Sequence, residues 1–286
     1  MLIVALTACA STVPTEPAPY GSPVTQQPSE LSEPGPIVLE TVVSARWSVP
    51  LKGLVDLDDP RAAELENGPH DIVLPVHVLT HPEHGAFIVD TGIARETVAR
   101  GLVASFLKSV DTVEPLADIL ARQPVPLAGV LLTHTHADHV LGLPDVPANV
   151  PVMAGPGDER SRNLNSWLTF SLLDRGLGDR PLSTWGFDEA RSLGPIEHAL
   201  DVFGDGTLFA LHVPGHTPGS TAYLARTTEG PVLFTGDCSH TQWGWDHGVA
   251  PGTYTEDHDG NVESLAALQS LADAIPGIRV VVGHEL

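Results

Sequence analysis

The stretch that decides the fold is "LLTHTHADHVLG", residues 131–142, in which three histidines and an aspartate follow an apolar run. In an extended segment alternate side chains point the same way, so His134 and His136 can project toward one point. Asp138 and His139 come after a turn and can be directed at a neighbouring point. Imidazole and carboxylate ligands together suit zinc, and also iron, manganese or cobalt. The stretch therefore predicts a metal centre.

Four ligands are too few for two complete metal sites, and three later segments supply further candidates. These are "HVPGHTPGS" with His216, "LFTGDCSH" with Asp237 and "VVVGHEL" with His284. Each candidate follows a predicted strand and comes directly after a glycine, which allows the backbone to approach a shared centre closely. Because His284 lies two residues before the last residue of the sequence, fraying there would weaken this ligand.

The order HxHxDH, GHTPGS, TGD and GH resembles the metallo-β-lactamase superfamily of hydrolases over residues 37–286. Within it the chain most resembles the N-acyl homoserine lactonase-like branch, through "DVFGDGTLFALHVPGHTPGS" (201–220) and "GVAPGTYTEDHDGNVESLAAL" (248–268). The resemblance implies an α/β (α+β) fold, a four-layer αβ/βα sandwich of two mixed β-sheets flanked by helices, with the metals at one edge.

The resemblance also implies how the ligands are shared between two divalent ions, most simply zinc, with iron, manganese or cobalt as alternatives. One ion would be bound by His134, His136 and His216, and the second by Asp138, His139 and His284, with Asp237 bridging. The aspartate of "DTG", Asp90, is implied to support this site.

The chemistry of such a pair follows from general principles. Two cations about 3.5 to 4 Å apart hold a hydroxide, because coordination lowers the pKa of water from about 15.7 toward about 7. The hydroxide attacks a carbonyl that one metal polarises, while the other stabilises the developing charge. The sequence therefore predicts a metal-dependent hydrolase that opens a lactone or carboxylic ester, with N-acyl homoserine lactones among the candidates.

Asp138 and His240 are the predicted catalytic residues. In the lactonases that the chain resembles, a tyrosine three positions after the bridging aspartate orients or protonates the opened lactone, and here that position is His240. A histidine could act there as a hydrogen-bond donor or general acid. The alternative is a solvent-facing loop histidine. The neighbouring Cys238 is interpreted as a small buried filler rather than a displaced metal ligand.

Two other functions remain open from the sequence. The first is a mononuclear iron enzyme with a reduced ligand set, as in the persulfide dioxygenase branch. The second is a lipid-anchored metal-binding module without turnover, which the missing tyrosine and the position of His284 near the terminus would suit.

Strands and helices alternate through the body of the chain, which favours packed sheet and helix layers in one domain, residues 37–286. Aromatic residues at 165–174 and 241–248 could form an acyl-chain pocket near the site. The turn "HPEHG" (81–85) predicts a hairpin. The predicted strands are 37–43, 72–79, 86–89, 128–132, 151–153, 208–213, 231–235 and 279–282, and the predicted helices are 94–108, 111–121, 158–174 and 261–274, the last with Asn261 as its N-cap.

The N-terminus predicts an anchor and a tether. An apolar run ends in Leu6-Thr7-Ala8-Cys9, which resembles the lipobox at which bacterial lipoproteins are lipidated on cysteine. Residues 1–9 are therefore interpreted as a signal and lipobox segment, and the Pro-rich residues 10–36 as a disordered tether. This places the protein in the cell envelope, with membrane attachment only through Cys9.

The charge of the chain limits its partners. A formal net charge of −22 comes from 14 Lys and Arg against 36 Asp and Glu, and such a surface repels nucleic acid and anionic membranes. The sequence therefore favours a small neutral or apolar acyl substrate and no nucleic-acid partner.

Overall fold

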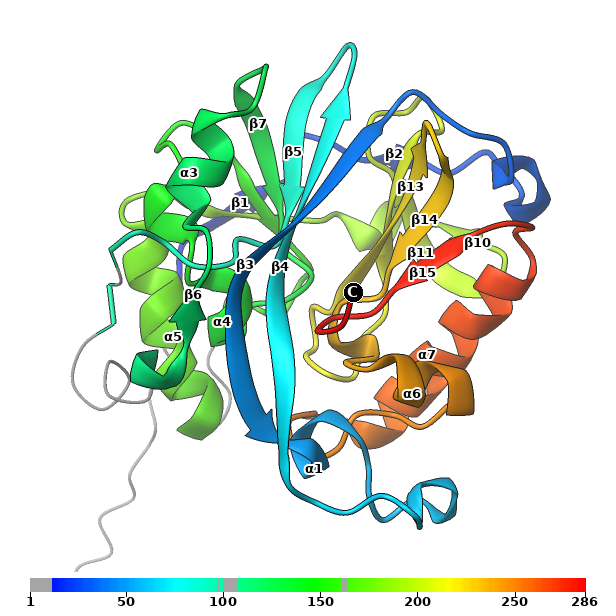
Figure 1. The fold of residues 1–286 in the computed structure, drawn as a ribbon. Coiled ribbons are helices and arrows are strands. Elements are labelled where there is room, and N and C mark those ends of the chain that lie inside the picture. The colour runs from blue at the N-terminus through cyan, green and yellow to red at the C-terminus, as the bar shows by residue number, and fades with distance from the viewer. Residues whose placement is uncertain (1–11, 97, 100–106, 161–163) are drawn as a thin grey trace, which may run out of the picture.

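Two mixed β-sheets face each other in the computed structural model, which describes residues 12–96, 98–99, 107–160 and 164–286 (Figure 1). The alternation of side chains along each strand separates the two faces. In β5, Phe87 and Val89 join the core between the sheets, while Ile88 joins the core on the outer face. The first sheet has the order β1 (Thr15–Pro17), β9 (Leu182–Thr184), β8 (Val152–Ala154), β7 (Leu127–Leu131), β5 (Gly85–Val89), β4 (Pro69–His81), β3 (Val38–Pro50) and β6 (Asp111–Thr112).

The second sheet repeats this alternation. In β12, Leu208 and Ala210 face the first sheet, while Phe209 and Leu211 face the helix behind. The order is β10 (Arg191–Leu193), β11 (Ile196–Asp201), β12 (Leu208–His212), β13 (Thr221–Thr227), β14 (Gly230–Phe234) and β15 (Arg279–Val281), and β2 (Ser22–Pro23) pairs with β11.

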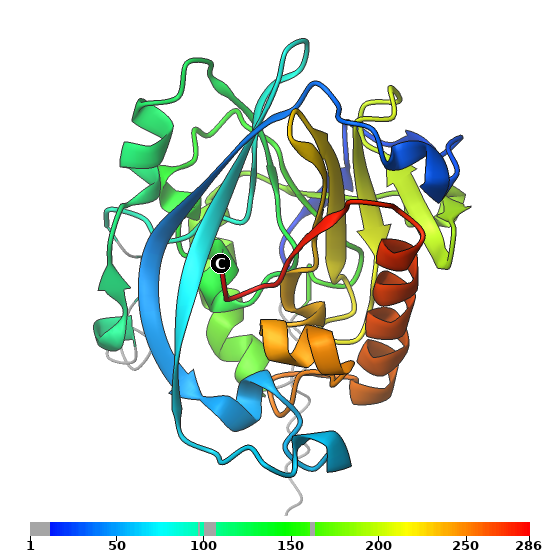
Figure 2. The same cartoon turned by 45° about the vertical axis from the view of Figure 1, so that its right-hand side comes forward.

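Helices cover the outer faces of both sheets. α3 (Leu116–Ala121) and α5 (Leu164–Leu177) lie outside the first sheet, and α6 (Gln242–His247) and α7 (His258–Asp273) lie on the side of the second (Figures 1 and 2). The layers are therefore αβ/βα, and the fold class that the resemblance implies is confirmed. Two short helices, α1 (Leu51–Leu54) and α4 (Ala137–Val140), contribute to the candidate site described below.

Most predicted elements are present, but several differ in extent. The helix predicted at 111–121 begins only at Leu116, after β6, and the one predicted at 158–174 spans Leu164–Leu177. The predicted hairpin joins β4 and β5, with His81 opposite Gly85. The last long helix begins one turn earlier than predicted, because the side chain of Asp257 caps it by accepting a hydrogen bond from the N–H of Gly260. Asn261 is instead buried inside the helix and donates to the carbonyl of Cys238. The helix predicted at 94–108 falls largely outside the described residues.

The prediction of a disordered tether at residues 10–36 is wrong for the part that the structure describes. β1 pairs in parallel with β9, and β2 pairs with β11. The side chains of Val13, Val24 and Leu31 are buried in the domain cores. The proline content suggested a coil, but prolines at the edges of strands and in the short 3-10 helix at 28–31 are compatible with docking. The domain therefore includes residues 12–36.

The predicted lipobox, with Cys9, lies outside the described residues. Among the helices of the described part, none has the length and apolar character needed to cross a bilayer.

Candidate metal centre

The HxHxDH segment begins where β7 ends. His134 and His136 lie in the extended loop after the strand, and Asp138 and His139 lie in α4. His134 and His139 are buried, whereas His136 and Asp138 are partly exposed. The loop thus directs four polar side chains to one edge of the first sheet, as the alternation and the following turn predict.

The three other predicted ligands come from loops that follow strands of the second sheet. His216 follows β12, Asp237 follows β14 and His284 follows β15, and all three are buried. The preceding glycines are needed for close approach. A Cβ at Gly283 would lie 2.3 Å from Oδ1 of Asp237, and one at Gly215 would lie 2.3 Å from the backbone nitrogen of Asn261.

One carboxylate oxygen, Oδ2 of Asp237, lies at the middle of these side chains. The Nε2 atoms around it are those of His139 and His284 at 3.3 Å, His216 at 3.5 Å and His134 at 3.6 Å. His136 contacts His216, with 2.8 Å between Nδ1 and Nε2. Oδ2 of Asp138 lies 3.4 Å from Nε2 of His284. The structure therefore brings all seven predicted ligands together.

These side chains form overlapping groups whose ligand atoms lie within 4.8 Å of one another. One group is His134, His136 and His216, and another is Asp138, His139 and His284. Asp237 shares a group with His134 and His139 and so connects the two. This grouping matches the division between two metals that the resemblance implies.

The orientation of the imidazoles suits metal ligation. Nδ1 of His284 donates to the carbonyl of Val73 at 2.9 Å, and Nδ1 of His139 contacts Oδ2 of Asp90 at 2.8 Å. Each ring therefore holds its Nδ1 proton toward an acceptor outside the centre and points Nε2 inward, the orientation of metal-binding histidines. Nε2 of His134, Nε2 of His139 and Oδ1 of Asp237 are buried without a hydrogen-bond partner. Buried polar atoms left without a partner around a carboxylate would be satisfied by a cation, so the residues fit a metal centre.

The distances have the size expected for ligands of one cation. Two atoms that each lie about 2.1 Å from a zinc ion are about 3.0 Å apart at a right angle and about 3.4 Å apart at the tetrahedral angle. The separations of 3.3 to 3.6 Å between Asp237 and the imidazoles fall near this range.

The protonation of the centre follows from burial and charge. Burial and neighbouring imidazoles hold the pKa of His134 and His216 well below the usual value, and burial lowers that of His136 to about 4. For His284 burial acts downward, but the charges of Asp237 and Asp138 prevail and raise its pKa to about 9. The carboxylates of the centre thus attract positive charge. Protons supply this charge in the metal-free protein, and metal ions would supply it when bound.

His284 is not frayed, in contrast to the expectation from its position near the terminus. Its backbone N–H donates to the carbonyl of His240, and its carbonyl accepts from Val73. With the Nδ1 contact to Val73, three hydrogen bonds hold this ligand between β4 and the Asp237 loop.

Asp90 supports the centre, as the resemblance implies. Its carboxylate accepts hydrogen bonds from the backbone N–H and the hydroxyl of Thr133 and contacts His139. Its φ of 57° is in the left-handed region, which aspartate tolerates better than most residues. The backbone there turns sharply from β5 to aim the carboxylate at the ligand loop.

His240 is buried, so the interpretation as a solvent-facing histidine is wrong. Its Nε2 lies 3.0 Å from Oδ2 of Asp237, inside the centre. Cys238 is buried, in agreement with its predicted role as a filler, and burial and the charge of Asp237 raise the pKa of its thiol. A thiol kept protonated is a poor metal ligand.

Two polar residues of the site were missed by sequence reasoning. Asp158 is buried and accepts hydrogen bonds from Thr135, Thr217 and Gly219, so it connects the two loops that carry His134, His136 and His216. It follows β8 without any motif, and only its contacts identify it. Tyr254 lies in the loop before α7, and its ring packs against Gly53 and lies 6.5 Å from that of His240. Tyr254 therefore places a phenol near His240, the residue that stands where the resembled lactonases have a tyrosine.

The aromatic residues expected to line an acyl pocket are partly packed in the cores. Trp243 packs against the core of the first sheet and stacks on His247, and Trp245 packs against that of the second. Phe170 is also partly buried, and the side chain of Trp167 lies outside the described residues. The acyl pocket stays a prediction.

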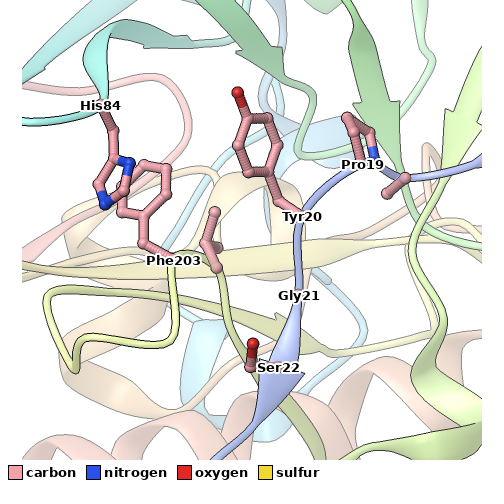
Figure 3. A pocket seen from close by; sticks show the side chains of 8 residues that line it. Pro19, Tyr20, Gly21, Ser22, His84 and Phe203 are labelled. Carbon is pink, nitrogen blue, oxygen red and sulfur yellow. The ribbon is translucent and has the colours of Figure 1, made fainter.

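A second group of potential ligands, His81, His84 and Asp205, lies at the opposite end of β5 from Asp90. It borders a pocket in which the ring of His84 stacks on Phe203 beside Tyr20 (Figure 3). Nδ1 of His81 accepts hydrogen bonds from the N–H groups of Glu83 and His84. The neutral ring must then carry its proton on Nε2, which faces Asp205 at 3.2 Å. This is the reverse of a metal-binding orientation, so we assign no metal to this group.

Comparison with solved structures shows the same fold. An N-acyl homoserine lactone lactonase described as quorum-quenching has a TM-score of 0.63 at 19% identity, covering 89% of this chain and 93% of its own. A mutant of AiiA from B. thuringiensis, solved with N-decanoyl-L-homoserine at its active site, also has a TM-score of 0.63, at 18% identity, covering 89% of this chain and 94% of its own. At these identities the likeness concerns the fold alone.

Sequence comparison gives relatives that are named as lactonases. The N-acyl homoserine lactonase AttM of Azorhizobium caulinodans is 28% identical over 226 residues, covering 76% of this chain and 83% of the relative. The AttM lactonase of Agrobacterium fabrum is 26% identical over 226 residues, and the match again covers 76% of this chain and 83% of the relative. The metallo-beta-lactamase superfamily matches residues 50–284, which contain all seven predicted ligands. The chain therefore belongs to the metallo-beta-lactamase superfamily.

Proposed function

We propose that the protein is a dinuclear metal-dependent hydrolase that opens a lactone or a related carboxylic ester. The observation that carries this proposal is the convergence of seven candidate ligand side chains from four loops, with four imidazoles within 3.6 Å of Oδ2 of Asp237 and buried polar atoms that lack partners. Divalent ions held there would acidify water and polarise a carbonyl at neutral pH. The AttM relatives, which are named as lactonases, support the choice of a cyclic ester.

The residues of the chain have distinct parts in this proposal. Asp90 holds the ring of His139, and Asp158 holds the loops of His136 and His216 in register. Asp138 has a side chain 17% exposed against 4% for Asp237, so substrate reaches the centre on the Asp138 side. A tyrosine phenol is protonated at neutral pH because its ordinary pKa is about 10, and burial and the charge of Asp138 raise the pKa of Tyr254 further. Tyr254 is therefore a hydrogen-bond donor available to a substrate oxygen at the entrance.

The substrate proposed is small and uncharged or apolar in its acyl part, as in N-acyl homoserine lactones. The strongly acidic chain disfavours anionic substrates, and Trp243 and Trp245 are only partly buried, which leaves aromatic surface near the Asp237 loop. We also propose zinc as the resident metal, since histidine-rich sets with carboxylates suit it.

The test is hydrolysis by full-length protein reconstituted with zinc, assayed against N-acyl lactones, aryl esters, a thioester and a cephalosporin. The full chain is required because residues 12–36 are part of the fold. Asp138→Ala should abolish turnover, whereas Asp188→Ala, which removes an exposed carboxylate that is not among the predicted ligands, should retain it. Failure of zinc-loaded protein to open any lactone or ester would exclude the proposal.

Metal analysis of the same sample separates the two alternatives. A single iron per chain with oxygen consumption would favour the persulfide-dioxygenase-like enzyme. Two metals without turnover on any substrate would favour the metal-binding module.

We further propose that Cys9 is lipidated and holds the protein in the cell envelope, on the strength of the Leu6–Cys9 motif. Fractionation of cells that express the natural chain, with Cys9→Ser as the control, tests this. Release of the protein from the membrane fraction only in the variant is expected, and equal distribution of both would refute the anchor.

A further inference from the structure

His240 lies closer to Oδ2 of Asp237 than do the four predicted imidazole ligands that surround this oxygen. Its Nε2 lies 3.0 Å from Oδ2 of Asp237, compared with 3.3 to 3.6 Å for the other four. The side chain is 2% exposed, and its ring lies 5.0 Å from that of His216 and 5.5 Å from that of His284. A proton donor to an incoming substrate would need an open path, which this ring lacks.

The contact of Nδ1 of His240 outside the centre determines that Nε2 is the nitrogen available to a cation. Nδ1 of His240 faces the backbone carbonyl of Leu54 in α1, at 3.2 Å. A carbonyl can only accept, so Nδ1 carries the proton and Nε2 presents its lone pair to the centre. The same arrangement holds for His284, whose Nδ1 donates to the carbonyl of Val73. His81, outside the centre, has the opposite arrangement.

The inner nitrogen points at the carboxylate at the middle of the centre. Nε2 lies 3.0 Å from Oδ2 of Asp237, while the carbonyl of Leu54 holds Nδ1 on the outer side. The separation equals that of two ligands at a right angle on one cation, about 3.0 Å for bonds of about 2.1 Å. His216, Asp237 and His240 also form a group whose ligand atoms lie within 4.8 Å of one another.

We propose that His240 is a metal ligand, an eighth member of the set, which shares a cation with His216 and Asp237. The inference rests on metal occupancy of the centre and does not depend on the substrate. It replaces the predicted role of His240 as a general acid, because a coordinated Nε2 with a protonated Nδ1 held by a backbone carbonyl has no proton to deliver to substrate.

The experiment measures zinc affinity by competition with a chromophoric chelator for the wild type and for His240→Gln and His240→Glu. The two variants have the same shape, but only the carboxylate of glutamate coordinates zinc well. Glutamine can still donate a hydrogen bond to Asp237. His198→Gln, an exposed histidine on β11, is the matched control, and circular dichroism checks that each variant folds.

If His240 is a ligand, His240→Gln should lose at least about tenfold in zinc affinity, the lower end of what loss of a supporting partner costs. His240→Glu should bind zinc more tightly than His240→Gln, and His198→Gln should match the wild type. If His240 only donates a hydrogen bond to Asp237, the order reverses, because glutamine replaces the donor and glutamate repels the carboxylate. That reversed order, or a His240→Gln variant with wild-type affinity, would overturn the inference.

A second readout is independent of activity and of absolute affinity. The visible absorption of protein loaded with cobalt(II) reports the number and type of ligands. It should change in His240→Gln and stay unchanged in His198→Gln. An unchanged spectrum in His240→Gln would count against coordination while leaving the hydrolase proposal intact, whereas a wild type that binds neither zinc nor cobalt would remove both proposals.

Discussion

The carboxylate of Asp90 sets the orientation of His139. Substitution of Asp90 by asparagine removes the carboxylate but keeps the left-handed backbone conformation, so it tests the carboxylate by itself. Asparagine tolerates the left-handed φ of 57° as well as aspartate does. It has only one acceptor oxygen, whereas Asp90 accepts from Thr133 twice and contacts His139. We expect Asp90→Asn to lower zinc affinity by about 10 to 100-fold, as for other partners of ligating histidines.

The measurement for Asp90→Asn is zinc competition together with thermal unfolding in chelator. The substitution Asp71→Asn, at an exposed position on β4, serves as the control. Wild-type zinc affinity in Asp90→Asn would show that the His139 ring is held by packing rather than by the carboxylate.

The buried carboxyl group of Asp158 should make the stability of the protein depend on pH. Burial raises its pKa to about 7, although it accepts hydrogen bonds from Gly219 and Thr217. Because the folded state holds this proton to a higher pH than the unfolded chain, stability falls as the pH rises from about 4 to about 7. The slope from one proton is at most about 1.4 kcal/mol per pH unit. Asp158→Asn removes the titration and therefore this component of the slope.

Urea unfolding of the wild type and of Asp158→Asn between pH 5 and pH 8 checks this. The difference in unfolding free energy, wild type minus variant, should decrease as the pH rises, since other titrating groups cancel in the difference. Asp188→Asn, which changes an exposed carboxylate, serves as the control. A constant difference for Asp158→Asn would mean that its hydrogen bonds keep the carboxylate ionised throughout.

At the scale of the element, the N-terminal segment behaves as part of the second-sheet core. Leu31, in the 3-10 helix at 28–31, is fully buried in that core. Truncation of a buried leucine costs about 2 to 5 kcal/mol through lost burial and the remaining cavity. We expect Leu31→Ala to lower the free energy of unfolding by this amount.

Denaturant unfolding measures the effect, and Val38→Ala is the matched control because Val38 is 54% exposed. The control should change stability by no more than about 0.5 kcal/mol. A similarly small change for Leu31→Ala would restore the interpretation of residues 10–36 as a tether.

At the scale of the whole molecule, the ligands come from both sheets. The loop after β7 provides four of them, and the loops after β12, β14 and β15 provide His216, Asp237 and His284. A bound cation therefore connects the two halves of the sandwich and favours the folded state. Zinc at about 1,000 times its dissociation constant should stabilise the fold by about 4 kcal/mol.

Thermal unfolding at several free zinc concentrations tests this coupling. We expect Tm to fall when a chelator removes metal and to rise with the logarithm of free zinc. Calcium, which prefers oxygen ligands, should leave Tm nearly unchanged. A Tm that does not respond to zinc would show that metal does not bind the folded state preferentially.

Much of the fold and of the centre could be predicted from sequence because the signals are local. The apolar runs at 72–79 and 86–89 and the turn between them predicted the hairpin of β4 and β5. The motif at 131–142 and the three glycine-preceded ligands predicted which side chains converge. Asp158 and Tyr254 carry no local pattern, and only the packing of distant loops places them at the site.

The sequence alone therefore determined the strand-end loops and the seven candidate ligands, since periodicity and residue chemistry act over a few neighbours, and its resemblance to a family implied the layers. The tertiary structure alone decided the docking of residues 12–36, because pairing with β9 and β11 joins segments more than 150 residues apart. It also decided which nitrogen of His240 points into the centre. Which nitrogen of an imidazole carries the proton depends on the atom it faces, and the carbonyl of Leu54 comes from a helix that no pattern near residue 240 reveals.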